Sequence, residues 1–169
     1  MNPIPEEGRK YLEVLLVEDS PGDVLLTREA FRDANTATRL HVTSDGAEAI
    51  AFLHREGEHS EAPRPDIILL DLNLPKVDGR EVLAHIKQDR SLKSIPTAIL
   101  SISENPADIT KSYQLQANCY IAKPAQWDAF LVLVNCINDF WLKRVKFPAR
   151  TVASGSWGLP DLGSSKKSG

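Results

Sequence analysis

The segment LLDLNLPKVDG, at residues 69–79, ends an apolar run on an acid, Asp71, and turn-forming residues follow at once. A buried carboxylate is costly unless a partner compensates its charge. A second apolar run, LEVLLV, also ends on acids, Glu18 and Asp19, whereas a third, CYIA, ends on a lysine, Lys123. Three carboxylates would repel one another, so the group requires a cation if the fold brings it together.

Oxygen ligands of this kind suit a hard divalent ion, and Mg²⁺ is the ion we predict for Glu18, Asp19 and Asp71. Protein-bound Mg²⁺ usually contacts one or two carboxylates together with a phosphate, which indicates phosphoryl chemistry. Asp71 is the predicted nucleophile, since a carboxylate can form an aspartyl phosphate. Ser101 and Lys123 would then contact the phosphate oxygens. Each group alone also has a simpler interpretation, such as a turn, a loop hydroxyl or a helix-terminal charge.

The elements that must position these groups form an alternating pattern of apolar runs and helix-like segments. Asp45 with Glu48, and Asp78 with Glu81, have the spacing of capping boxes that begin helices. The predicted strands are 12–17, 39–43, 66–71, 95–100 and 119–122, and the predicted helices are 24–34, 45–54, 78–89, 105–115 and 127–143. This order predicts an α/β fold, a doubly wound (βα)5 open parallel sheet with helices on both faces. Ligands of such sheets bind at the carboxyl ends of the strands, where the candidate groups would meet.

The composition limits the class of protein. The 169 residues have an apolar fraction of 42%, enough for one domain with its own core. The net charge of -3 and the lack of a basic stripe argue against a nucleic-acid partner. We find no signal-peptide pattern and no membrane-spanning apolar stretch. Cys119 and Cys136 match no metal-ligand or disulfide spacing, so we expect two buried, reduced thiols in a cytoplasmic protein.

The chain divides into a domain at 11–147 and two extensions. Residues 1–10 are polar and contain two prolines, which predicts an N-terminal extension. Residues 148–169 are rich in Gly, Ser and Pro, which predicts a flexible C-terminal extension. In an alternative interpretation, Trp157 and Leu159 dock on a partner surface.

Four sequence segments, VLLVEDSPGD, ILLDLNLPKVDG, IPTAILSIS and NCYIAKP, resemble the signature segments of CheY-like receiver domains of two-component response regulators. The resemblance covers roughly residues 11–142 and implies a flavodoxin-like, CheY-like fold. It implies that Asp71 is the phosphoacceptor, that the Asn73 backbone carbonyl is a third metal ligand, and that Tyr120 is the switch aromatic. The peptide bond before Pro124 is expected to be cis, as in that family.

The same resemblance assigns the remaining groups of the site. Ser101 is the implied switch hydroxyl, Lys123 the phosphate-binding lysine, and Glu18 a metal ligand acting largely through water. Ser101 stands where threonine is commoner, and Ile102 stands where the family usually has a small residue. Because a bulky side chain there would narrow access to Asp71, we predict altered phosphotransfer or slower loss of phosphate.

The ending INDFWLKRVKFPAR and the segment NCYIAKP further resemble single-domain regulators that partner phytochrome-type histidine kinases in bacteria. The implied function is a phosphorylation switch that catalyses only its own phosphorylation and dephosphorylation, and is otherwise no enzyme. Two alternatives stay open at this point. One is a degenerate receiver that binds partners without phosphorylation. The other is an aspartate-nucleophile phosphatase, although the Asp-x-Asp word after the first strand is missing.

The segment QWDAFLVLVNCINDFWLKR, residues 126–144, is apolar nearly all round at helical spacing. A helix of this kind is buried nearly all round. Trp127 and Phe130 begin the stripe that we expect to cover the sheet. The remaining apolar side chains predict a homodimer through the fourth and fifth helices and the strand between them, a common dimer face in the resembling family. The alternative is a partly apolar surface helix. The predicted dimer-face residues are Tyr113, Leu133, Cys136, Phe140 and Trp141.

Overall fold

The computed structural model describes residues 11–33 and 37–148. The predicted N-terminal extension, and the C-terminal extension from residue 149 onward, lie outside the described residues. The predicted docking of Trp157 and Leu159 therefore stays a prediction. Among the described residues, no helix has the length and hydropathy that a membrane crossing requires.

Five parallel strands form one sheet in the order β2-β1-β3-β4-β5, which confirms the predicted doubly wound fold. A helix follows every strand along the chain, so each pair of consecutive strands is joined through a helix. The strands are β1 Leu12–Val17, β2 Thr38–Thr43, β3 Ile67–Leu70, β4 Thr97–Ser101 and β5 Cys119–Ala122. The helices are α1 Pro21–Asp33, α2 Gly46–His54, α3 Gly79–Gln88, α4 Pro106–Gln114 and α5 Trp127–Ile137, with short turns η1 Gly57–His59 and η2 Asn138–Leu142.

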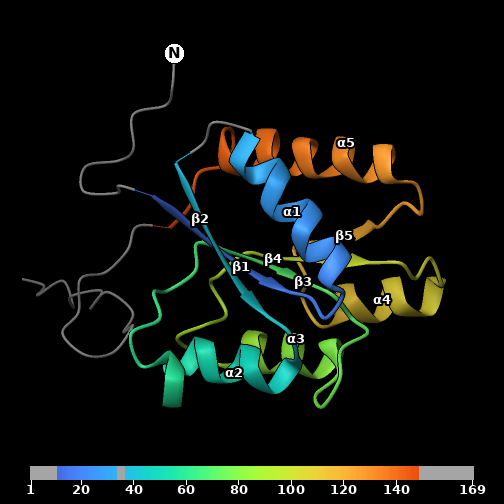
Figure 1. Ribbon diagram of the computed structural model, residues 1–169. Helices are drawn as coiled ribbons and strands as arrows, with labels where there is room; N and C mark the ends of the chain where they lie inside the picture. The colour runs from blue at the N-terminus through green and yellow to red at the C-terminus, as the bar shows by residue number, and fades with distance from the viewer. Residues whose placement is uncertain (1–10, 34–36, 149–169) are drawn as a thin grey trace, which may run out of the picture.

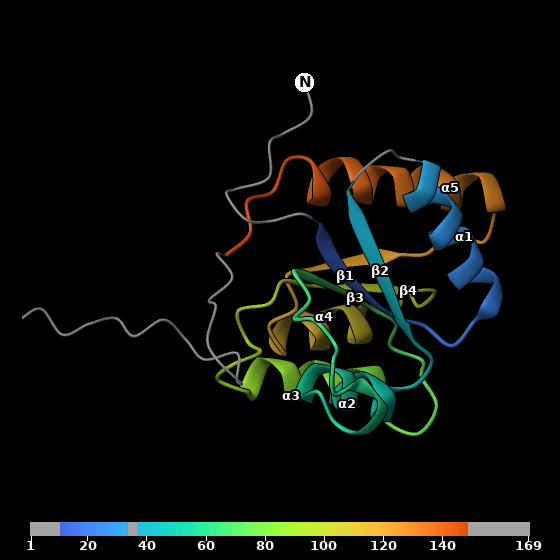
Figure 2. The ribbon, with the colours of Figure 1, turned by 60° about the vertical axis from the view of Figure 1, so that its left-hand side comes forward.

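The helices form two layers around the sheet, with α1 and α5 on one face and α2, α3 and α4 on the other (Figures 1 and 2). The central strand β3 is buried on both faces, because its side chains alternate between two core clusters. Ile68 and Leu70 pack with α2 and α3, whereas Ile67 and Leu69 pack with α1 and α5. This two-sided burial explains why β3 reads as a continuous apolar run.

The strand register brings the polar ends of the strands to one edge of the sheet. Val17 pairs with Leu70, so the residues that follow β1 and β3 are neighbours. Ser101, the last residue of β4, pairs with Ala122, the last residue of β5. The order in which successive strands are added to the sheet reverses between β1 and β3. In this class of fold, ligands bind in the crevice at such a switch point.

Two glycines allow the loop after β3 to pack closely against the helices. A Cβ at Gly79 would lie 2.1 Å from the carbonyl oxygen of Asp71, and a Cβ at Gly46 would lie 2.0 Å from that of Val77. Any other residue at either position would push this loop away. The close approach therefore helps to hold Asp71 in place.

The predicted capping residues begin two helices. Asp45 Oδ1 accepts the N–H of Glu48 at 2.8 Å and so caps α2. In α3, Asp78 Oδ1 accepts the N–H of Arg80 at 2.9 Å. Satisfying these otherwise unpaired donors fixes where each helix starts.

Some expectations for the last helix and the cysteines were wrong. The predicted helix 127–143 itself is present to within one residue, because α5 continues after Ile137 as a π-helical segment to Leu142. Trp127 is exposed rather than packed on the sheet, whereas Phe130, near the start of the same helix, is buried as predicted. Cys136 is also exposed and Cys119 is half-buried, so neither is the buried thiol that we predicted.

Candidate functional site

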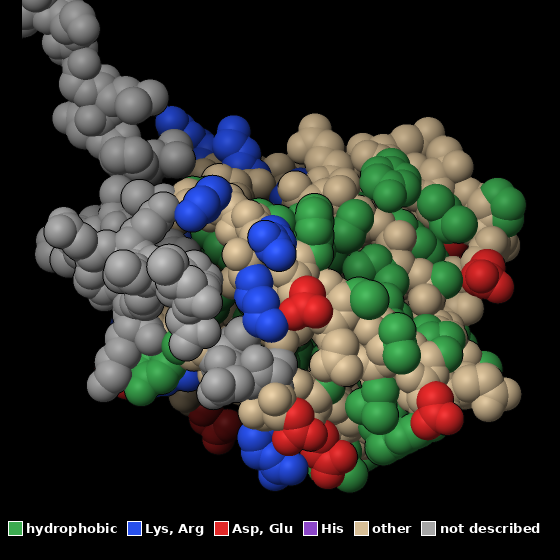
Figure 3. All heavy atoms as spheres, turned by 90° about the horizontal axis from the view of Figure 1, so that it is seen from above, with side chains coloured by type: hydrophobic (Ala, Val, Ile, Leu, Met, Phe, Trp, Pro, Cys, Tyr) green, Lys and Arg blue, Asp and Glu red, His purple; other side chains and the backbone are tan. Residues whose placement is uncertain are grey.

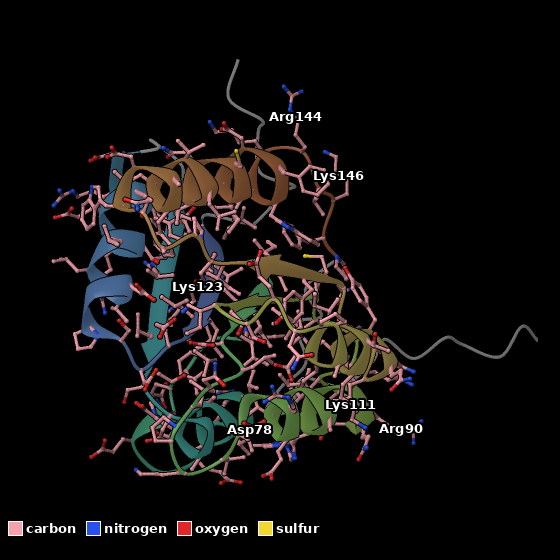
Figure 4. All side chains as sticks on the ribbon, turned by 90° about the vertical axis from the view of Figure 1, so that its right-hand side faces the viewer. Asp78, Arg90, Lys111, Lys123, Arg144 and Lys146 are labelled. Carbon is pink, nitrogen blue, oxygen red and sulfur yellow. The ribbon has the colours of Figure 1, made fainter. Side chains whose placement is uncertain are left out.

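The side chain of Lys123 lies at the centre of an acidic pocket at the carboxyl edge of the sheet. Its Nζ donates a short hydrogen bond to Glu18, and it contacts Asp71 Oδ2 and Asp23 Oδ2 at 3.0 Å each. The side chains of Lys123 and Glu18 are only 3% and 2% exposed. Figure 4 shows Lys123 well inside the molecule, whereas the labelled Arg144 and Lys146 lie at the periphery.

Three carboxylates beside this lysine have the arrangement of a cation site. One oxygen from each of Glu18, Asp19 and Asp71 lies within 4.8 Å of the others. Glu18 and Asp71 are buried, whereas Asp19 is exposed and opens the pocket to solvent. An all-oxygen set with one solvent-facing ligand fits Mg²⁺, which keeps several waters when it binds proteins.

The electrostatics of the pocket show a surplus of negative charge. Burial raises the pKa of Glu18 to about 7, although the hydrogen bond from Lys123 lowers it. Burial lowers the pKa of Lys123, but the hydrogen bond to Glu18 and the charge of Asp71 outweigh it, so this pKa stands above its usual value. The lysine is therefore charged at neutral pH, and it alone does not compensate all of the acids. A divalent cation would complete the balance.

Ser101 lies directly beside Lys123 at the ends of β4 and β5. The backbone N–H of Lys123 donates to the Ser101 carbonyl oxygen at 2.7 Å. The Ser101 side chain is fully buried, and its Oγ accepts the N–H of Ser103 at 3.3 Å. Ile102 is 69% exposed, so this bulky residue lies at the surface of the loop that follows Ser101.

Tyr120 connects this loop to a network that sequence reasoning missed. Its hydroxyl donates to the Ser103 carbonyl oxygen at 2.7 Å. Ser103 Oγ donates to Asp108 Oδ2 at 2.5 Å, and Arg80 donates to Asp108 Oδ1 at 2.5 Å. The loop that carries Ser101 is thus joined to α3, α4 and β5. No sequence motif marked Arg80 or Asp108, because they are 28 residues apart and meet only in the fold.

Two predictions from the resemblance concern the loops around the pocket. The N–H of Asn73 donates to Asp71 Oδ1 at 3.2 Å, which places the residue beside the predicted phosphoacceptor. The expected cis bond between Lys123 and Pro124 was wrong, because no peptide bond of the described residues is cis. The trans form is the favoured isomer before proline, and Lys123 reaches all three acids with the bond trans.

Asp23 is a further member of the pocket that the sequence interpretation omitted. It lies in the first turn of α1, and its carboxylate reaches Lys123 across 100 residues of sequence. The motif EDSPGD contains it, so the signal was present as a third acid close to Glu18 and Asp19. The helix dipole also favours an acid in a first helical turn, so the sequence alone did not indicate that Asp23 contacts Lys123.

The predicted dimer-face residues lie on α4, α5 and η2 with much of their apolar surface uncovered. Tyr113 is 51% and Phe140 59% exposed, and Cys136 is exposed as well. Leu133 and Trp141 are half-buried, and Trp141 packs edge-on against Phe140 with ring centroids 5.6 Å apart. Figure 3 shows hydrophobic side chains gathering on the face of the molecule that carries α1 and α5.

Residues 14–135 match the family model of the response regulator receiver domain, and the chain belongs to this family. The predicted family and fold are confirmed, and the protein is a signalling receiver domain. Its sequence is 46% identical to "Response regulator Rcp1" of Synechocystis sp. over 144 residues, which is 85% of this chain and 98% of Rcp1.

Solved structures agree with this similarity. The Mn²⁺-bound form of response regulator Rcp1 superposes with a TM-score of 0.80 at 46% identity, covering 82% of this chain and 99% of that one. The phosphorylated cyanobacterial phytochrome response regulator RcpA gives the same TM-score at 47% identity, with the same coverage. The protein is therefore a response regulator closely related to Rcp1 and RcpA.

Proposed function

We propose that Asp71 accepts a phosphoryl group from the phosphohistidine of a sensor histidine kinase, and that Mg²⁺ is the metal this requires. The observation that carries the proposal is the contact of Lys123 Nζ with Asp71 Oδ2 inside a pocket of three metal-competent carboxylates. An isolated buried carboxylate needs only one counter-charge. Asp71 instead shares the ammonium group of Lys123 with Glu18 and Asp23.

The phosphoryl transfer is a nucleophilic displacement at phosphorus. An oxygen of Asp71 bonds to the phosphorus atom, the P–N bond to the kinase histidine breaks, and the imidazole keeps the electron pair and takes up a proton. Asp19, Asp71 and the Asn73 backbone carbonyl would hold Mg²⁺ directly and Glu18 largely through water, and the ion's charge would offset that of the phosphoryl oxygens. Lys123 would pair with one of these oxygens, and Ser101 Oγ would donate a hydrogen bond to another.

The contacts of the loop after Ser101 would transmit the effect of phosphorylation to the surface of the protein. When the Ser101 hydroxyl turns toward the phosphoryl oxygens, it releases the Ser103 N–H that it accepts in this structure. Ser103 also accepts the Tyr120 hydroxyl, so a moved loop frees this aromatic ring to follow. Tyr120 lies on β5, and its N–H contacts the Tyr113 hydroxyl of α4 at 3.2 Å. A local charge change would thus alter the α4–β5–α5 face.

This face is where we propose that a homodimer forms. The exposed apolar side chains of Phe140 and Tyr113 would lie against the same patch of a second copy, as a twofold interface requires. Phe140→Asp should shift the protein toward the monomer in sedimentation velocity runs. Leu25→Asp is the matched control, because Leu25 is also exposed but lies on α1. An unchanged dimer in Phe140→Asp, or a monomeric wild type, would exclude this interface.

The proposed partner is a phytochrome-type histidine kinase in the cytoplasm. The similarity to a structure described as a phytochrome response regulator supports this pairing. Phosphotransfer from a bacteriophytochrome kinase should be much faster than transfer from histidine kinases of other sensor classes at equal concentration. Equal rates from all kinases would reject the partner but leave the phosphoacceptor assignment intact.

Acetyl phosphate tests the phosphoacceptor without any kinase. We expect one phosphoryl group per chain in the presence of Mg²⁺, and almost none after chelation by EDTA. Absence of labelling with Mg²⁺ would instead favour a degenerate receiver. Steady turnover of a generic phosphoester, such as p-nitrophenyl phosphate, would favour a phosphatase.

A further inference from the structure

Two histidines face one another at the opposite end of the sheet from Asp71. His54 is the last residue of α2 and His85 lies in the last turn of α3. Their Nε2 atoms are 2.7 Å apart, and their rings are nearly perpendicular, with centroids separated by 5.0 Å. Both side chains are half-buried, so the pair is accessible to an ion from solvent. Neither residue has a part in the phosphorylation pocket.

A carboxylate completes this group. Asp89 follows α3, one helical turn after His85, and one of its oxygens lies within 4.8 Å of a ring nitrogen of each histidine. The carboxylate is held in place because Oδ1 accepts the N–H and the hydroxyl of Ser91 at 2.7 and 2.6 Å and the N–H of Leu92 at 3.1 Å. All three of these hydrogen bonds use Oδ1, and they fix the carboxylate beside the two histidines.

Asp89 and the carboxyl ends of two helices bring negative charge to this position, which the nearby Arg64 guanidinium offsets in part. The hydrogen bond from the Ser91 hydroxyl lowers the pKa of Asp89, so the carboxylate is ionised at neutral pH. His54 is the last residue of α2 and Asp89 directly follows α3, and the carboxyl end of a helix carries partial negative charge that attracts cations. Figure 2 shows α2 and α3 side by side below the sheet, so both helix ends contribute at one place.

We propose that His54, His85 and Asp89 form a second metal site, which takes a divalent transition ion such as Zn²⁺. Two imidazole nitrogens and one carboxylate oxygen are ligands for a borderline ion of this class, whereas Mg²⁺ prefers oxygen alone. Water would supply the fourth ligand. The bound ion would join the ends of α2 and α3 more firmly than the single hydrogen bond between His54 and His85.

Binding requires only a small movement of the two rings. At Zn–N distances of about 2.0–2.1 Å, tetrahedral geometry separates two nitrogens by about 3.3 Å. The Nε2 atoms must therefore move apart by roughly half an ångström and turn their lone pairs toward the ion. In this structure the two Nε2 atoms form one hydrogen bond, in which one ring donates and the other accepts.

The test is zinc titration of the whole chain in excess Mg²⁺, which occupies the carboxylate pocket, against a chromophoric chelator. We expect wild type to bind one Zn²⁺ that Mg²⁺ does not displace. His54→Gln and His85→Gln should each weaken binding by at least about tenfold, the lower limit seen even for outer partners of metal ligands. His59→Gln is the matched control, because His59 lies five residues from His54 but pairs with Glu48. It should bind Zn²⁺ like wild type.

Two further measurements keep the outcome unambiguous. Labelling by acetyl phosphate should be equal in wild type and the His54 and His85 variants, which shows that they fold and that the two sites are separate. A crystal soaked in Zn²⁺ should give an anomalous peak between the two rings at the zinc edge. Wild type that binds no Zn²⁺ in excess Mg²⁺, or variants that bind it as tightly as wild type, would overturn the proposal and leave only the hydrogen-bonded pair.

Discussion

The two ends of the sheet carry polar clusters built in different ways. At the carboxyl edge, acids that follow β1 and β3 surround Lys123, which follows β5. At the opposite end, His54 and His85 come from the ends of two helices and contact each other directly. In the first cluster the ammonium group of Lys123 is buried with Glu18 and Asp71, whereas the second cluster is half-buried and has no ammonium group among its three members.

This difference shows how fold geometry selects chemistry. Strand ends in a parallel sheet converge, so residues from distant sequence segments form a compact, enclosed pocket. Helix carboxyl ends add partial negative charge and leave their side chains near solvent. A phosphoryl group on Asp71 requires the enclosed pocket with its fixed cation. A metal held by imidazoles requires only the adjacent helix ends.

The largest effect is expected from Asp71→Asn, which should abolish labelling by phosphorylated kinase and by acetyl phosphate, because the amide cannot form the acyl phosphate. Asp89→Asn is the control from the other end of the sheet and should label as fully as wild type. Mass spectrometry of the intact chain measures both. Stoichiometric labelling that persists in Asp71→Asn would place the phosphoacceptor elsewhere.

Lys123→Met should slow phosphorylation by roughly a hundredfold, the usual effect of losing one group that stabilises developing charge. It should also reduce the free energy of unfolding by about 3 kcal/mol, because Glu18 and Asp71 lose their buried counter-charge. Added Mg²⁺ should recover part of this stability. Urea denaturation with and without Mg²⁺ measures the effect.

The control for this variant is Lys143→Met, which removes an exposed ion pair with Asp139 and should change stability by less than about 1 kcal/mol. Equal losses of unfolding free energy in the two variants would show that Lys123 stabilises the fold no more than an exposed ion pair does.

Asp45→Ala should reduce the free energy of unfolding by about 1 kcal/mol, because it removes the cap of α2, the helix that connects the two ends. The hydrogen bond from the Glu48 N–H, then the contact with Lys76, lowers the pKa of Asp45 below its usual value of 3.8 in the folded state. Its stabilisation is therefore complete above that value and disappears as the pH falls through the lowered pKa.

Urea denaturation of wild type and Asp45→Ala at pH 7 and near pH 2 should show a difference that shrinks in acid. Asp33→Ala, at an exposed position at the end of α1, is the control and should be nearly neutral. A difference between wild type and Asp45→Ala that is independent of pH would contradict the role of the ionised cap.

The smallest effect is expected from Ile102→Ala. Because Ile102 lies beside the buried Ser101, its removal should open access for water and shorten the half-life of the phosphorylated protein a few-fold, of order 1 kcal/mol in the barrier. Single-turnover loss of the phosphoryl label measures it, and Val132→Ala on α5 serves as an exposed control. An identical half-life in Ile102→Ala and wild type would retire the idea that this residue shields Asp71.

Much of the fold and the core of the pocket could be predicted from the sequence. Apolar runs that end on Glu18, Asp71, Ser101 and Lys123 determine both the strands and their polar ends, because parallel strands present all such ends to one edge. Their approach within the structure follows from that topology. Their roles in phosphoryl transfer stay predictions until the labelling experiments are done.

Only the tertiary structure decided the contacts between elements that no local pattern connects. The contact of Asp23 with Lys123, the link from Arg80 to Asp108 and the exposure of Trp127 depend on how the helices pack on the sheet. His54 and His85 meet for the same reason, 31 residues apart. The trans bond before Pro124 was likewise seen only in the structure. Strand periodicity and turn residues specify local backbone, whereas the direction of a side chain toward a distant partner is set by packing across the whole domain.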